Sequence, residues 1–470
     1  MRYIIIFILL IQTYGLYSQT VKWYLPWENR KSHLIEDDIS AVPLYINGTA
    51  YRILKVVSAP GNSIKNISII SDDIASEIFY LPTDQSGKMD VLIPYKPNIS
   101  YNGENLFLIK FIGKKSGVKN VKLKIGFKRG TKEYLKKIKI SPINSYGKLN
   151  SNVWAYLDYN YLIKGLNTSV VDDLYRHHIN FIVIPGYAQP SLDINRNEIA
   201  KLDSYLKTLG NKFDYYCIYL SGYQDKKSSI LSNSWKLKFP FWFQEIQKTF
   251  IKNNISPNKI LLYPFDEPSD FNIKESSKFV KYLKSKNISV KTFITLHKLG
   301  SENLALEYDF VQVHIRNDEL LKKVISLGKN PKMILNYETN VSSGNDNHPR
   351  RYLELPWKAI RYNLGGYGMW SYADVKKSDM TEFNNGKGSW EFTKINRGDF
   401  YNSLIHRKIN TLYSSLRWEA FSAGQDEYYW MQKLVNGKLL NKKNTLINSL
   451  LDKKMSLKEW EKLKLSLDEN

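Results

Sequence analysis

The sequence of 470 residues contains a single cysteine, Cys217, so no disulfide can form within the chain. A chain of this length can bury a core large enough to hold its fold without cross-links. The sequence also lacks a Gly-Xaa-Ser-Xaa-Gly elbow, a phosphate-binding loop and a His-Glu-Xaa-Xaa-His pair, which argues against esterase, kinase and metalloprotease chemistry. We therefore expect the protein to need no cofactor and no metal ion.

Long apolar runs are scarce, and the clearest one lies at the start of the chain. Arg2 and Tyr3 precede the apolar residues 4–11, and a small and polar stretch continues to Thr20. The run is shorter than the roughly 20 residues that cross a bilayer, and the pattern is typical of a secretory leader. We expect residues 1–18 to be a cleaved signal peptide, and the mature protein to be secreted or periplasmic without a membrane span. An uncleaved anchor is the alternative.

Acidic residues are few, with 45 Asp and Glu against 68 Lys and Arg, for a net charge of +23. A basic surface favours anionic partners, so an anionic polysaccharide is one candidate. Lysines are scattered through the whole chain without an arginine-rich arm, and we expect no nucleic acid as a partner. The 33 Tyr and 11 Trp residues are numerous. Aromatic rings cover the apolar faces of sugars, although many of these side chains would simply fill the core.

Residues 19–141 alternate short apolar segments with turn signals, as in Val42–Gly48 and Val121–Phe127. Strands of this length and spacing predict an N-terminal β-sandwich. The segment that follows, Ser141–Gly147, is rich in turn-forming residues and predicts a linker to a second domain.

The pattern changes over residues 148–404, where eight short apolar runs alternate with helical patterns. The runs start at Val153, Phe181, Tyr216, Ile260, Val290, Phe310, Met333 and Gly368. The helical patterns cover Ser169–His178, Asn197–Leu209, Phe241–Lys252, Ile273–Lys286, Asp318–Leu327 and Tyr352–Tyr362. Alternating strands and helices predict parallel βαβ units, and eight of them match a closed (β/α)8 TIM barrel. An open doubly wound sheet is the alternative, but no glycine-rich dinucleotide turn follows the first strand. Residues 405–470 predict C-terminal helices packed on the barrel.

Two adjacent carboxylates, Asp266 and Glu267, directly follow the predicted fourth strand. Catalytic groups of such barrels lie at the carboxyl ends of the strands. Because neighbouring side chains alternate in direction, Pro268 and the local turn must splay the pair toward one ligand, and repulsion should raise the pKa of one carboxyl. A glycosidase needs a protonated acid under the leaving oxygen, the role we assign to Glu267. If the sugar carries a 2-acetamido group, Asp266 would orient that group, whose oxygen can then attack the anomeric carbon. A surface turn is the alternative.

Other residues at predicted strand ends are expected to shape a sugar pocket. They are Trp154, Tyr156 and Asp158 after the first strand, His314 and Arg316 after the sixth, Tyr337 after the seventh, and Trp370, Tyr372 and Asp374 after the eighth. Trp370 or Tyr372 would serve as a stacking platform, although packing in the core explains each of these residues equally well. His177 and His178 precede the second strand, at the opposite end of the barrel, and we interpret them as structural rather than as a metal pair.

Three further motifs are more distinctive in combination. They are Tyr263–Pro268, Arg351–Ala359 leading to Gly365–Tyr372, and Ser415–Tyr428 with its Arg417, Glu419, Gly424 and Asp426-Glu427-Tyr428 run. Together they resemble glycoside hydrolase family 123, the retaining N-acetylgalactosaminidase-like enzymes, and the related domain of unknown function 4091. The resemblance covers the barrel and the helix after it. It implies substrate-assisted catalysis, with Asp266 as amide orienter and Glu267 as acid/base, and a β-sandwich before the barrel. Arg417 and Glu419 lie on different helix faces and predict a buried ion pair that locks their helix to the barrel.

One residue departs from the family pattern. Glu338 follows the seventh strand in the run Asn336–Thr339, and an acid there is similar to two-carboxylate barrel hydrolases, with Glu267 as acid/base and Glu338 as nucleophile. That mechanism needs the two carboxyl groups about 5 Å apart and no acetamido group.

The sequence therefore predicts a retaining glycoside hydrolase of N-acetylated hexosaminides, similar to β-N-acetylgalactosaminidases. The alternatives are a two-carboxylate enzyme acting on a polysaccharide without acetamido groups, and a carbohydrate-binding protein without activity. In all three cases the partner is an oligo- or polysaccharide.

Overall fold

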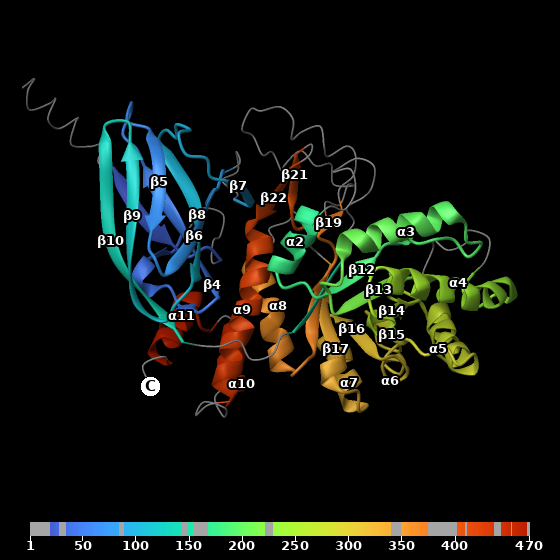
Figure 1. Ribbon diagram of the computed structural model, residues 1–470. Helices are drawn as coiled ribbons and strands as arrows, with labels where there is room; N and C mark the ends of the chain where they lie inside the picture. Colours follow the sequence, from blue (N-terminus) through green and yellow to red (C-terminus); the bar gives the residue numbers. More distant parts are fainter. Residues whose placement is uncertain are drawn as a thin grey trace, which may run out of the picture.

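The computed structural model describes residues 19–27, 34–83, 89–142, 149–154, 168–220, 229–339, 349–374, 402–408, 411–436, 443–452 and 454–467. They form a β-sandwich, a closed barrel of eight parallel strands surrounded by helices, and further helices after it (Figure 1). The predicted fold class, a TIM barrel with an N-terminal sandwich and C-terminal helices, is confirmed. The expected signal peptide lies outside the described residues. No helix in these ranges is both long and apolar enough to span a bilayer.

The N-terminal domain consists of an eight-stranded sheet and a four-stranded sheet, in the orders β2-β1-β4-β8-β6-β7-β22-β21 and β3-β10-β9-β5. Its elements from this part of the chain are β1 (Thr20–Tyr24), β2 (Glu36–Asp37), η1 (Ile39–Ala41), β3 (Leu44–Tyr45), β4 (Thr49–Val57), β5 (Ile64–Ile70), β6 (Ile74–Tyr80), β7 (Val91–Pro94), β8 (Glu104–Gly113), β9 (Gly117–Phe127) and β10 (Gly130–Ser141). In β9, Val121 and Leu123 are buried, whereas Lys122 between them is partly exposed. This is the alternation of a half-buried strand. The buried side chains of β9 belong to the same hydrophobic core as Phe107 of the larger sheet.

The barrel closes because its first strand pairs with both its second and its last. Its strands are β11 (Asn150–Trp154), β12 (Phe181–Ile184), β13 (Tyr215–Tyr219), β14 (Ile260–Tyr263), β15 (Lys291–Leu296), β16 (Phe310–His314), β17 (Ile334–Glu338) and β18 (Gly366–Met369). Val153 of β11 lies opposite Ile182 of β12 on one side and Met369 of β18 on the other. Each strand overlaps one of the eight predicted apolar runs.

Helices surround the barrel. They are α2 (Thr168–Arg176), α3 (Arg196–Leu209), α4 (Asn233–Lys252), α5 (Asp270–Ser285), α6 (Leu304–Glu307), α7 (Asp318–Ser326) and α8 (Arg350–Arg361), with the 3-10 turns η2 (Gly186–Ala188), η3 (Pro257–Lys259) and η4 (Pro331–Met333). Ser232, Ser269 and Asn317 precede α4, α5 and α7, and each side chain accepts a hydrogen bond from the N–H group three residues later. Such caps satisfy the free N–H groups of the first turn. The Ser269 cap starts α5 two residues after Glu267 and so fixes where the acidic segment ends.

Aromatic and aliphatic side chains fill the barrel interior. The rings of Phe181 and Phe293 lie 5.2 Å apart there. In β18, a Cβ atom on Gly368 would lie 2.2 Å from the amide nitrogen of Gln312. The glycine therefore leaves room for the buried hydrogen bond of 3.2 Å that the Asn152 side chain donates to Gln312. The interior is a packed core rather than a pore, which leaves the carboxyl ends of the strands as the place for chemistry.

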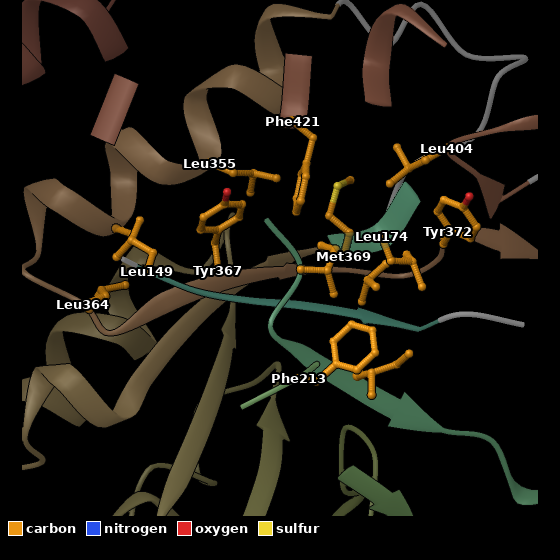
Figure 2. Packing of buried hydrophobic residues seen from close by; sticks show 14 of the residues in the cluster. Leu149, Leu174, Phe213, Leu355, Leu364, Tyr367, Met369, Tyr372, Leu404 and Phe421 are labelled. Carbon is orange, nitrogen blue, oxygen red and sulfur yellow. The ribbon is translucent and has the colours of Figure 1, made fainter. Parts of the chain in front are cut away.

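The C-terminal part of the chain joins the two domains. It forms β19 (Ala373–Asp374), β20 (Asn402–Ser403), β21 (His406–Lys408), β22 (Thr411–Ser415), α9 (Leu416–Asn436), α10 (Lys443–Leu451) and α11 (Leu457–Leu467). β22 pairs with β7, so the β21–β22 hairpin extends the larger sandwich sheet. α9 lies between sandwich and barrel (Figure 1), and its Phe421 packs on Tyr367 of β18 with ring centroids 4.9 Å apart (Figure 2). α11 contacts the sandwich, where Glu461 pairs with Arg52 at 2.6 Å.

Buried charged groups hold α9 in place. Arg417 pairs with Asp90, next to β7, at 2.9 Å, and both side chains are almost fully buried. Glu419 lies 3.2 Å from His177, just after α2 of the barrel, and accepts a hydrogen bond of 2.9 Å from Tyr51 of the sandwich. The predicted burial of Arg417 and Glu419 in ion pairs is confirmed, but these pairs reach the sandwich as well as the barrel. His177 takes part in these buried ion pairs, in agreement with the structural role predicted for it.

The charge on His177 should make stability depend on pH. Burial alone would lower the pKa of His177, but the carboxylates of Asp173 and Glu419 raise it to about 9. The protonated ring therefore adds stability that is complete below its ordinary pKa of 6.5 and is lost as the pH rises through about 9. We expect the free energy of unfolding to fall by on the order of 3 kcal/mol across this window, and to fall less in His177→Gln. Urea titrations on both sides of the window measure the slope, and equal slopes in the two proteins would contradict the assignment.

Candidate active site

Asp266 and Glu267 lie just beyond the carboxyl end of β14, at the mouth of the barrel. The backbone of Glu267 has a φ of 43°, in the left-handed region that costs a non-glycine residue roughly 1–2 kcal/mol. The turn sends the two side chains to different neighbours, because Asp266 contacts Thr295 of β15 and Glu267 contacts Tyr337 of β17. The local turn therefore directs the two neighbouring side chains as the sequence analysis expected.

The carboxylate of Asp266 is anchored through one of its two oxygen atoms. Oδ1 accepts hydrogen bonds from the hydroxyl groups of Tyr263 and Thr295, the second at 2.5 Å. Within the described ranges Oδ2 has no hydrogen-bond partner, so it can accept a hydrogen bond from a ligand. Desolvation raises the pKa of Asp266 and the charge of Glu267 adds to the rise, while the two hydroxyl groups act against it. The residue as a whole is nevertheless exposed, so a ligand can reach its carboxylate from solvent.

Glu267 is held in a similar way, by side chains of β15 and β17. Its Oε1 accepts a hydrogen bond from the hydroxyl group of Tyr337, and its backbone N–H donates to Oγ1 of Thr295 at 3.1 Å. Desolvation and the charge of Glu267 raise the pKa of Tyr337, so the phenol keeps its proton and remains a donor at neutral pH. Thr295 therefore contacts both acidic residues. Thr295 was not among the expected site residues. Strand alternation could have identified it, because it comes two residues after the inward-facing Phe293 at the end of a strand.

Aromatic side chains line the wall beside the carboxylates. The ring of Trp154 meets Tyr219 of β13 at 4.9 Å and Tyr263 at 5.7 Å, in both cases edge to face. Trp370 is partly buried against the same cluster. Trp154 thus lies beside Tyr263, whose hydroxyl group contacts Asp266, and apolar sugar faces find partners in such aromatic rings. Tyr219 was not anticipated, although it follows the inward-facing Cys217 by two residues.

His314 supports Glu267 indirectly. Its ring stands at 89° to that of Tyr337 with centroids 5.0 Å apart, and its Nε2 lies 3.4 Å from the Thr339 hydroxyl group. Burial lowers the pKa of His314, which keeps the ring neutral at neutral pH. Arg316, two residues further, is exposed. Tyr337 and His314 therefore belong to the wall on the Glu267 side, as their strand-end positions suggested.

Glu338 occupies a different environment from Tyr337, its neighbour in β17. It is almost completely buried and forms an ion pair of 2.7 Å with Arg351, in the first turn of α8. Asn336, two residues earlier and on the same strand face, donates a hydrogen bond of 3.3 Å to the carbonyl group of Leu355 in α8. Oε2 of Glu338 thus pairs with α8, whereas its Oε1 lies 4.0 Å from Nε2 of His314, so the carboxylate lies between the helix layer and the wall on the Glu267 side. Arg351, its partner, was not expected among the site residues.

In fold, the chain is similar to a family 123 glycoside hydrolase. That structure, from Clostridium perfringens, concerns glycolipid glycan hydrolysis; it matches with a TM-score of 0.65 and 12% sequence identity over 92% of this chain and 91% of its own. A GH5 xyloglucanase from Bacteroides ovatus matches with a TM-score of 0.37 at 8% identity, over 83% and 99% of the two chains. A GH2 beta-galacturonidase from Eisenbergiella tayi has a TM-score of 0.37 at 10% identity, over 87% and 71%. No protein-family model and no curated protein matches this chain.

Tyr372 corrects one expectation. It is fully buried, its hydroxyl group donates to Asp173 of α2 at 2.6 Å, and its ring meets Trp418 of α9 at 5.2 Å. Tyr372 is therefore a packing residue between helices and is not a stacking platform. β18 ends at Met369, so the strand alternation that would have turned Tyr372 inward no longer applies. Trp370 keeps the role of candidate platform.

The side chains of the remaining expected residues are not among those that the structure describes. Tyr156 and Asp158 fall outside the described residues, and Asp374 belongs to β19 without a described side chain. Residues 155–167, 221–228 and 340–348, which come just after β11, β13 and β17, are outside as well, and so are residues 375–401. Among the described residues, no three His, Cys, Asp or Glu side chains converge as metal ligands would.

Proposed function

We propose that this chain is a retaining glycoside hydrolase that cleaves N-acetylated hexosaminides by substrate-assisted catalysis. The observation that carries the proposal is the acidic pair at the barrel mouth, in which each carboxylate is held through one oxygen and keeps its second oxygen for a ligand. A titratable group with a raised pKa at the end of a barrel strand is a frequent mark of an active site. The fold similarity to a family 123 enzyme supports the same class of reaction.

The two residues divide the chemistry between them. Glu267 donates a proton to the glycosidic oxygen while the carbonyl oxygen of the substrate's acetamido group attacks the anomeric carbon and displaces that oxygen. Asp266, ionised, accepts the acetamido N–H, which orients the amide and stabilises its developing positive charge. In the second step Glu267 takes a proton from a water molecule that attacks the same carbon and reopens the cyclic intermediate. Two displacements at one carbon give net retention of configuration.

The environment of Glu338 bears on the two-carboxylate alternative. A nucleophile must reach the anomeric carbon, whereas the carboxylate of Glu338 is neutralised by Arg351 on the side of α8. Its pairing suits a positioning role, since it fixes the start of α8 and the end of β17, on which Tyr337 holds Glu267. We therefore assign no bond-forming step to Glu338. Export of the protein is also part of the proposal and rests on the N-terminal sequence pattern.

The substrate class is tested by screening aryl glycosides of galactose and glucose, with and without a 2-acetamido group, against the purified protein. Hydrolysis restricted to the acetamido sugars is the expected result. Equal turnover of sugars without the acetamido group, or labelling of Glu338 by an activated fluorosugar, would overturn the mechanism in favour of the two-carboxylate one. Binding of these sugars without turnover would favour a carbohydrate-binding protein.

Thr295→Val should change the pH profile in a defined direction. The hydrogen bond from Thr295 lowers the pKa of Asp266, so its loss raises that pKa further. Because Asp266 acts as a carboxylate, activity is lost as the pH falls through its pKa, and the acid limb of kcat/KM should move to higher pH.

Thr292→Val is the matched control on the same strand, because the hydroxyl group of Thr292 donates to Asp309 at 3.0 Å and not to the acidic pair. Its acid limb should stay where the wild type has it. An unmoved limb in Thr295→Val, or the same movement in both variants, would contradict the role given to Asp266.

A further inference from the structure

A groove lies on the outside of the barrel, between α4 and α5. It encloses about 790 Å³ and is lined by Leu231, Asn233, Lys236, Leu237, Glu275, Lys278, Lys281, Tyr282, Ser285 and Lys286. The two walls are fixed to each other, because the Tyr282 hydroxyl group donates to the carbonyl oxygen of Lys236 at 2.8 Å and its ring meets that of Trp235 at 5.5 Å. The groove is therefore preformed, and its volume falls within the range of ligand sites.

The charge in this groove is unbalanced. Four lysines face a single carboxylate, Glu275, which already pairs with Lys278 at 2.7 Å. Among the described residues, Lys236, Lys281 and Lys286 have no carboxylate within ion-pair distance. Positive charges that gather in a concavity reinforce one another's field and attract anions. The groove thus selects for negative charge.

The shape of the groove favours an extended ligand. From Glu275 to Lys286 the wall formed by α5 rises by about 16 Å. The exposed Leu237 adds apolar surface between the charges, and the largely buried Leu231 and Tyr282 contribute only their edges to the lining. A compact anion would meet only part of this length. A flat bilayer could not enter a depression between two helices, whereas a flexible chain could follow it. A ligand with repeated anionic groups on rings with apolar faces matches both features.

We propose that the α4–α5 groove is a second, non-catalytic binding site for an anionic polysaccharide, one that carries sulfate or carboxylate groups along its chain. The site is separate from the acidic pair at the barrel mouth and stands or falls independently of the reaction catalysed there. Its lysines hold the anionic groups, and its apolar residues contact the sugar rings. Such a site would keep the protein on a polymer that it encounters.

The test measures binding of dextran sulfate, polygalacturonate and neutral dextran by calorimetry at low and at physiological salt. The variant combines Lys236→Gln, Lys281→Gln and Lys286→Gln. The matched control combines Lys115→Gln, Lys128→Gln and Lys137→Gln, three exposed lysines of the sandwich, and so removes the same charge elsewhere. Wild type should bind at least one anionic polymer and not dextran. The groove variant should lose roughly tenfold or more in affinity, whereas the control should keep it.

Several outcomes would overturn the site. Equal loss in both triple variants would mean that binding follows the net charge of the protein and not the groove. Failure of wild type to bind either anionic polymer would do the same, as would binding to vesicles of phosphatidylserine without binding to the polymers. All six side chains are exposed, so both variants should unfold at the wild-type temperature. This measurement checks that the fold is intact. A failed aryl glycoside screen leaves this result untouched, so the two proposals fail separately.

Discussion

Glu267→Gln should lower kcat by about 10²–10⁴-fold on an aryl N-acetylhexosaminide with a poor leaving group, the range that a general acid contributes. The amide cannot donate the proton that the departing oxygen needs, although it has nearly the same shape as the acid. The loss should shrink when the leaving group is a dinitrophenolate, because an oxygen of low basicity departs without protonation. Steady-state kinetics on a series of aryl leaving groups measures both effects.

The control for this variant is Glu319→Gln, an exposed glutamate in the first turn of α7. It should keep wild-type kinetics on every leaving group. A Glu267→Gln enzyme whose loss is the same for good and poor leaving groups would have been damaged in its fold or in substrate binding. That result would remove Glu267 from the role of acid.

Arg417→Met should destabilise the protein by about 3–5 kcal/mol, because it leaves the carboxylate of Asp90 buried without its partner. Both side chains are no more than 3% exposed, and the guanidinium group also makes two further hydrogen bonds to Asp90 at 3.0 and 3.1 Å. The pair joins α9 to the residue next to β7, so its loss should loosen the junction between sandwich and barrel. Chemical denaturation at neutral pH measures the change in the free energy of unfolding.

Two companion variants make this prediction specific. Asp90→Asn combined with Arg417→Met should recover part of the loss, since the uncompensated charge is then gone. Arg196→Met, at an exposed position in the first turn of α3, should change stability by about 0.5 kcal/mol or less. A cost for Arg417→Met as small as that for Arg196→Met would show that the buried pair does not hold the junction.

The barrel could be predicted because buried parallel strands appear in sequence as short continuous apolar runs. Each run overlapped an observed strand, and the position of Asp266 and Glu267 at a strand end followed directly. This reasoning could not predict the direction in which a side chain points once the strand has ended. Glu338 and Tyr337 are adjacent in β17, and only Tyr337 contacts the acidic pair. Strand alternation could have separated them, whereas Tyr372 lies beyond the end of β18, where alternation carries no information.

Long-range contacts were the second gap. The hairpin β21–β22 joins the sandwich sheet through pairing of Ser414 with Leu92, residues that are far apart in the chain. The two strands have only three and five residues, most of them polar, and segments this short carry no clear periodic signal of their own. The partners of α9 could not be predicted either, because the sequence shows that a buried Arg417 needs an acidic partner but not that this partner is Asp90. Thr295 was overlooked for a related reason: a hydroxyl group is common, and only its neighbours make it part of a site.

The central claim is that the acidic pair binds and activates an acetamido sugar. The most direct measurement is the dissociation constant of N-acetylhexosamine thiazolines of the galacto and gluco series, which mimic the cyclic intermediate. We expect one of them to bind wild type at least about a hundredfold more tightly than the corresponding free N-acetylhexosamine, and Asp266→Asn to lose most of that difference. Thiazolines that bind no better than the free sugars, or equally well to wild type and Asp266→Asn, would contradict the account.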